Sequence, residues 1–132
     1  MVEFDYTPPR HNVQTYAYPV DVNFANTAAA PATLGPFTMP SGIVKRFWMD
    51  IPDGSRNHVL AQVLLGGVQW IPAAAGMYIR GNNYVFDMEQ FQDIFDSNNK
   101  VTIVAWNDGL ANLVLYIHHI TFYFTLQLAG VL

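Results

Sequence analysis

Residues 118–128 of the chain read HHITFYFTLQL. Apolar side chains alternate along it with polar ones and one tyrosine: Ile120, Phe122, Phe124, Leu126 and Leu128 against His119, Thr121, Tyr123, Thr125 and Gln127. A period of two is typical of a β-strand, whose successive side chains point to opposite faces. The pattern therefore places His118 on the apolar face and His119 on the polar face. Because burying a charged imidazole is costly, we expect His118 to be neutral and hydrogen-bonded.

The same period recurs upstream and predicts further strands. In VQTYAYPVDV, residues 13–22, the even positions from Tyr16 to Val22 are apolar, and Pro19 indicates an edge strand or a bulge because it cannot donate a ladder hydrogen bond. In GIVKRFWMDI, residues 42–51, one face carries Phe47, Met49 and Ile51, and the other carries Arg46, Trp48 and Asp50. The run HVLAQVLL, residues 58–65, is apolar on both faces except Gln62, which is typical of a strand inside a core, and VTIVAWND, residues 101–108, is similar.

Three segments break this pattern. DMEQFQDIFDSNN places Met88, Phe91 and Phe95 at helical spacing, so the sequence predicts a short helix over about 87–97. Residues 1–12 indicate an extended N-terminal arm, and residues 26–42 indicate a long Ala/Pro-rich loop around one short strand.

No internal repeat or linker divides the chain, so we expect one domain over residues 1–132. Short strands with long connections predict an all-β antiparallel sandwich of seven or eight strands, jelly-roll-like, with the short helix and the arm attached. An immunoglobulin-like sandwich is the second choice.

The composition indicates a protein whose surface is largely buried against other subunits. Hydrophobic residues make up 52% of the chain and charged residues 12%, about half the share of charge in an ordinary domain. We therefore expect other subunits to cover much of the surface. The net charge is −4 and the basic residues are scattered, which disfavours nucleic-acid binding. Residues 109–132 carry no charge, but polar residues interrupt them and no Lys/Arg flanks them closely, so we expect no membrane span. The first residues lack a signal-peptide pattern.

No catalytic pattern emerges, so we expect a protein that is not an enzyme and holds no cofactor or metal. The chain has no cysteine, which excludes thiolate chemistry. A cupin-type metal site would favour His-x-His, which is absent, and His118 and His119 face opposite ways. The serines lie in turns without a G-x-S-x-G motif, and the acidic residues at 87–96 suit the solvated face of the expected helix. A small cupin-like metalloenzyme stays the least favoured alternative.

The middle of the chain resembles a known group of proteins. The resemblance rests on short sequence motifs at the ends of expected strands and in turns: IPDG (51–54), GGVQWIP (66–72), GMYIRGNN (76–83) and WND (106–108). Over residues 43–108 the chain resembles small single-domain β-sandwich virion proteins of tailed phages and related viruses, which decorate or cement capsid shells. The resemblance implies a non-enzymatic structural protein of the virion, acting as a decoration protein or small capsid subunit. Its partners would be its own copies and a major capsid or other shell protein, and it would occupy the host cytoplasm during assembly.

Contact residues follow from the arm, the loop and the apolar C-terminal residues. We expect these to lie in interfaces: Phe4, Tyr6, Pro8, Pro9, Phe37, Met39, Val131 and Leu132. The main alternative is a carbohydrate- or receptor-binding module in which exposed rings of Trp70, Tyr78 and Tyr84 stack on a sugar.

Overall fold

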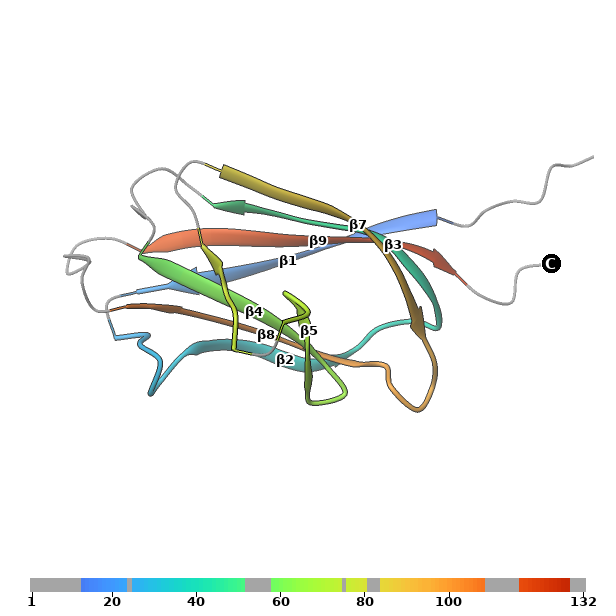
Figure 1. The fold of residues 1–132 in the computed structure, drawn as a ribbon, viewed down its shortest axis with the longest axis horizontal. Coiled ribbons are helices and arrows are strands. Elements are labelled where there is room, and N and C mark those ends of the chain that lie inside the picture. Colours follow the sequence, from blue (N-terminus) through green and yellow to red (C-terminus); the bar gives the residue numbers. More distant parts are fainter. Residues whose placement is uncertain are drawn as a thin grey trace, which may run out of the picture.

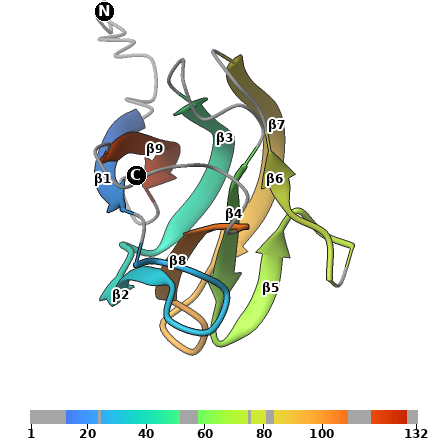
Figure 2. The same ribbon diagram turned by 90° about the vertical axis from the view of Figure 1, so that its left-hand side faces the viewer.

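Two antiparallel sheets pack face to face in the protein (Figures 1 and 2). The computed structural model describes residues 13–23, 25–51, 58–74, 76–80, 84–108 and 117–128. The four-stranded sheet has the order β1-β9-β3-β7, and the five-stranded sheet has the order β2-β8-β4-β5, with β6 paired to β4. The strands are β1 (Val13–Val22), β2 (Ala32–Thr38), β3 (Gly42–Ile51), β4 (Val59–Leu65), β5 (Val68–Ile71), β6 (Ile79–Arg80), β7 (Tyr84–Ile94), β8 (Lys100–Asn107) and β9 (His118–Leu128).

The stretch 118–128 forms β9, which lies inside the four-stranded sheet between β1 and β3. It pairs with β1 in one unbroken register that runs from Val13↔Gln127 to Val22↔His118. The apolar residues of β9 up to Leu126 are buried, so the predicted alternation is confirmed. β1 lies at the edge of the sheet, as Pro19 indicated.

The core lies between the two sheets. Its largest rings are Phe47 on β3 and Phe122 and Phe124 on β9, all fully buried, with the Phe47 centroid 5.1 Å from that of Phe124. Side chains of the five-stranded sheet, including Ile71 and Ile103, belong to the same buried cluster. Full burial of each such side chain stabilises the fold by about 1.5–3 kcal/mol. The period-two residues thus supply most of the packing.

Gly42 allows β3 and β9 to approach closely at the start of β3. A Cβ atom on Gly42 would lie 2.2 Å from the backbone oxygen of Gln127. No side chain fits at that distance, so glycine is required by the pairing itself.

The predicted helix over 87–97 is wrong. Residues 84–94 form β7, an edge strand that pairs antiparallel with β3, from Tyr84↔Ile51 to Ile94↔Gly42. Phe91 is 78% exposed and Phe95 is 57% exposed, so they do not form a buried helical face. Met88, Glu89 and Gln90 favour helix locally, but pairing with β3 overrides that preference. The acidic residues of this segment therefore do not form a helix face.

The remaining segments match the expectations in part. The segment 26–42 contains one strand, β2, whose pairing with β8 is irregular between Leu34 and Phe37. Gly66 and Gly67 form the turn between β4 and β5. The arm, residues 1–12, lies outside the described residues. Within the described ranges, no helix has the length and apolar character needed to cross a membrane.

Candidate interaction surfaces

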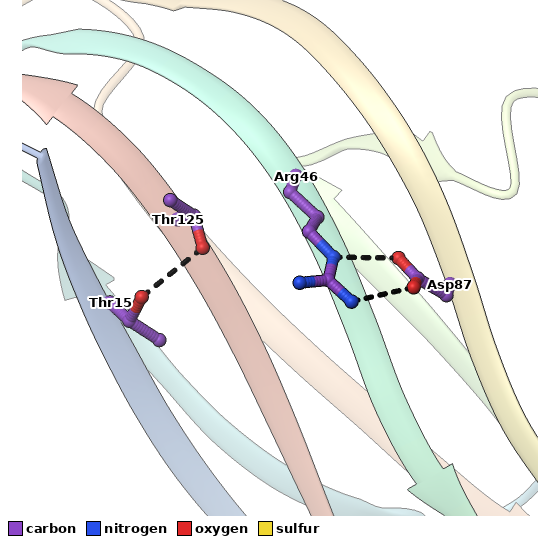
Figure 3. A network of polar contacts seen from close by, with 4 residues as sticks. All are labelled: Thr15, Arg46, Asp87 and Thr125. Carbon is purple, nitrogen blue, oxygen red and sulfur yellow. Dashed lines mark hydrogen bonds and ion pairs between the residues drawn. The ribbon is translucent and has the colours of Figure 1, made fainter.

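The outer face of the four-stranded sheet carries a row of polar contacts between neighbouring strands (Figure 3). Arg46 on β3 holds Asp87 on β7 through two hydrogen bonds, from Nε to Oδ1 at 2.9 Å and from Nη2 to Oδ2 at 2.6 Å. The hydroxyls of Thr15 on β1 and Thr125 on β9 lie 3.2 Å apart. The hydrogen bonds from Arg46 lower the pKa of Asp87 below its usual value. These contacts join β3 to β7 and β1 to β9 on this face.

An aromatic pair lies in the middle of the same face. The rings of Trp48 and Tyr123 are stacked, with centroids 4.8 Å apart and planes within 6°. The guanidinium carbon of Arg46 lies 4.4 Å from the centroid of the Trp48 ring, which is a cation–π contact. Trp48 thus contacts its neighbours within the chain through its rings, and it does not form an open platform for a ligand.

At the rim of this face, β7 exposes apolar side chains. Val85 is 53% exposed and Phe91 is 78% exposed, and both point outward with the acidic residues of β7. The Lys45 ammonium lies 4.7 Å from the centroid of the Phe91 ring. Large apolar side chains with this exposure favour contacts with other proteins.

The two adjacent histidines point to opposite faces, as predicted. His118 is 5% exposed, and burial, followed by the charge of His119, lowers its pKa, which favours the neutral ring. The predicted hydrogen bond is not found at its Nε2, which is buried and has no partner among the described residues. His119 is exposed, and its Nδ1 lies 2.6 Å from Oδ1 of Asp21. The pair is therefore split between core and surface.

The described part of the chain holds no cluster of side chains that could bind a metal ion. Within those residues, no three His, Cys, Asp or Glu side chains gather as a metal site would require. His58 Nδ1 lies 2.9 Å from Oδ2 of Asp108, and the Asp108 N–H donates to the His58 carbonyl at 2.9 Å. These two contacts tie the start of β4 to the end of β8.

The predicted contact residues are placed only in part. Met39 is fully buried in the chain's own core, so its side chain has no free surface for a neighbour. Phe37 is half-buried, and its ring stacks on Tyr18 with centroids 4.2 Å apart. The other predicted contact residues lie outside the described residues: Phe4, Tyr6, Pro8, Pro9, Val131 and Leu132.

Two of the three proposed sugar-stacking rings, Trp70 and Tyr78, are placed by the structure. Trp70 is 9% exposed and stacks on Phe124 in the core, with centroids 5.7 Å apart. Tyr78 is 45% exposed, and its ring meets Trp106 edge to face at 5.1 Å. Tyr84 begins β7, and its side chain is outside the described residues. Trp70 thus has no ring face to offer a sugar.

The sequence did not predict the stacking of Trp48 on Tyr123, although its pattern placed both rings on the outer face. Strand alternation put Trp48 on the face of Arg46 and Asp50, and put Tyr123 among the polar residues of 118–128. An aromatic residue on the polar side of a strand is the signal. What the pattern lacked was the register that sets Trp48 opposite Tyr123.

Comparison with known proteins supports the fold. No family model matches the chain, and no curated protein matches its sequence. A chain of the cyanophage Pam1 capsid asymmetric unit superposes with a TM-score of 0.55 at 18% identity, over 89% of this chain and 85% of that chain. The chain has a jelly-roll fold, as that chain of the capsid does.

Two other solved structures are less similar. The tobacco streak virus coat protein superposes with a TM-score of 0.49 at 10% identity, over 92% of this chain and 89% of that chain. A family two carbohydrate esterase from Cellvibrio japonicus gives 0.36 at 14% identity, over 86% of this chain and 34% of that chain. At these TM-scores, neither likeness bears on what this chain does.

Proposed function

We propose that the protein is a non-enzymatic structural component of a virion, acting as a capsid decoration protein or a small capsid subunit. It works by self-assembly and by contacts with neighbouring shell subunits, in the virion and, during assembly, in the host cytoplasm. The observation that carries the proposal is the superposition on the cyanophage Pam1 capsid chain, which covers most of both chains. The likeness is therefore one of whole domains.

The surface supports the same function. Charged residues are only 12% of the chain, and a free monomer ordinarily relies on surface charge for solubility. Large apolar side chains are nevertheless exposed: Val13, Val68, Met77, Tyr78, Val85, Phe91, Phe95 and Ile117. Contacts between subunits would remove these side chains from water. Burial of Trp70 removes the ring at the centre of the sugar-binding alternative.

Light scattering after size-exclusion chromatography tests this proposal, together with electron microscopy of the same fractions. We expect oligomers that grow with concentration and show closed symmetry. Replacing Phe4 and Tyr6 together by serine tests the arm, and replacing Val131 and Leu132 by serine tests the C-terminal contact. Each pair is expected to reduce assembly and leave the β-sheet circular dichroism unchanged. Thr33→Ser, on an exposed polar residue of β2 outside that apolar set, is the control and is expected to leave assembly unchanged. A monomer at every concentration, with no ordered particles, contradicts self-assembly.

A further inference from the structure

The edge strands of the two sheets differ in length and in whether they contain proline. Pro19 lies within the edge strand β1, and Pro36 lies in the irregular part of the edge strand β2. The other edge of the five-stranded sheet is formed by β5 and β6, which have four and two residues. β7 has eleven residues without proline or glycine, and among the described strands it pairs with β3 alone. Figure 2 shows β7 as the last strand on its side of the sheet.

A free edge of this length is a template for another strand. Alternate residues of an edge strand direct their N–H and C=O groups away from the sheet, where a further strand can pair with them. Proteins commonly blunt such edges with proline, bulges or short strands, and this chain does so at β1, β2 and β5. β7 is long and free of proline, although its pairing with β3 shifts register between Glu89 and Gln92.

The charge on β7 is acidic and partly unpaired. Asp87 is bound by Arg46, but in the described part of the chain neither Glu89 nor Asp93 forms an ion pair. Both point outward with Val85 and Phe91, so the exposed side of β7 carries both acidic and apolar residues. A strand lying beside it would be favoured by basic residues on that side and disfavoured by acidic ones.

On its inner side, β7 borders an apolar hollow. The hollow has a volume of about 460 Å³ and lies between β7 and the β5–β6 segment, with Phe86, Pro72, Ala74, Met77 and Tyr78 in its lining. Met77 is 58% exposed. A strand added at the edge would direct every second side chain toward this hollow, where apolar groups would be removed from water.

We propose that the free edge of β7 receives an extended segment of another protein, which pairs as a fifth strand of the four-stranded sheet. The segment has apolar residues at alternate positions, facing the hollow, and Lys or Arg between them, facing Glu89 and Asp93. The assignment rests on the proposed function in one respect: it takes the segment to belong to a neighbouring shell protein. Backbone pairing supplies affinity, and the charges select the partner.

Charge disfavours the two occupants that this chain itself could supply. Symmetric pairing with β7 of a second copy, centred on Glu89, would set the two Glu89 carboxylates opposite each other. The N-terminal arm carries Glu3 and Asp5 at alternate positions, so its acidic side would lie against that of β7. A basic segment meets neither repulsion.

A pair of capped peptides tests the proposal on the full chain. One alternates lysine and valine, and the other alternates glutamate and valine. We expect the lysine peptide to bind at least about tenfold more tightly, with amide shifts in NMR spectra confined to β7 and its surroundings. Replacing Glu89 and Asp93 together by lysine is expected to reverse the preference. N-methylation of alternate peptide nitrogens is expected to abolish binding, because it blocks strand pairing and keeps the charge.

Several outcomes overturn the proposal. The proposal is wrong if the lysine peptide does not bind to the folded chain. It is also wrong if the two peptides bind equally, or if N-methylation leaves binding unchanged. Concentration-dependent shifts in β7 without peptide would assign the edge to a second copy. Shifts in β7 caused by replacing Phe4 and Tyr6 with serine would assign it to the arm. A chain that assembles but does not bind the peptide overturns this inference alone, whereas one that binds but stays monomeric overturns self-assembly alone.

Discussion

The rings of Trp48 and Tyr123 lie face to face on the outer side of the four-stranded sheet, with centroids 4.8 Å apart. The two residues are direct cross-strand partners on β3 and β9, so the stack joins two neighbouring strands outside the core. Stacked aromatic pairs of this kind contribute beyond the area they bury.

A double-mutant cycle between Trp48→Ala and Tyr123→Ala is expected to give a coupling energy of about 0.5–1.5 kcal/mol in urea unfolding. The matched control couples Trp48→Ala with Thr15→Ala, since β9 separates β1 from β3. That second coupling is expected to be close to zero. Equal values in the two cycles would show that the stack contributes no specific stability.

The Arg46–Asp87 pair predicts a shifted acid titration. Because Asp87 accepts two hydrogen bonds from Arg46, its pKa lies below the usual value in the folded chain. Its contribution to stability is therefore present above the unfolded pKa and is lost as the pH falls through the folded pKa. Carboxyl carbon NMR shifts of Asp87 measure this directly. Arg46→Gln is expected to move the pKa of Asp87 back up, and an unmoved titration would contradict the pairing in solution.

Burial of His118 predicts a loss of stability in mild acid. Its pKa is lowered in the folded chain, first by burial, so folding favours the neutral ring. The native state is therefore most favoured above the unfolded pKa, about 6.5, and loses stability as the pH falls through the folded value. Urea unfolding at pH 7.5 and pH 5 measures this difference. His118→Gln is expected to remove the contribution of His118 to this difference in unfolding free energy. His119→Gln, on the exposed side, is expected to keep most of the difference. An identical pH dependence in both variants would exclude His118 as the cause.

The strand at 84–94 predicts a contrast between two phenylalanines. Phe122→Ala removes a fully buried ring and is expected to destabilise the protein by about 3–5 kcal/mol. Phe91→Ala removes a ring that is 78% exposed and is expected to change stability by less than about 0.5 kcal/mol, apart from its contact with Lys45. Thermal unfolding distinguishes the two. A large loss of stability from Phe91→Ala would instead indicate that Phe91 is buried, as in the helix predicted over 87–97.

Local pattern was enough to predict some of the strands. Alternation along 118–128 places Phe122 and Phe124 inward, and Pro19 correctly marks an edge. Pattern failed at 87–97, because Met88 and Glu89 favour helix and only the distant pairing with β3 makes them a strand. It placed Trp48 on the outer face with Arg46, but it gave no face for Trp70, which packs in the core. The edge of β7 was not foreseen, since an edge is a property of the sheet order.

The position of β9 has a consequence for how the chain folds. Among the described strands β9 comes last in the sequence, yet β1 and β3 both pair with it and not with each other. During synthesis, the first strand therefore has no partner in its sheet until residues 118–128 have left the ribosome. The pairing Val13↔Gln127 closes a loop of nearly the whole described chain, and such distant contacts slow folding. Until then the apolar side of β1 stays open to chaperones and to other nascent chains.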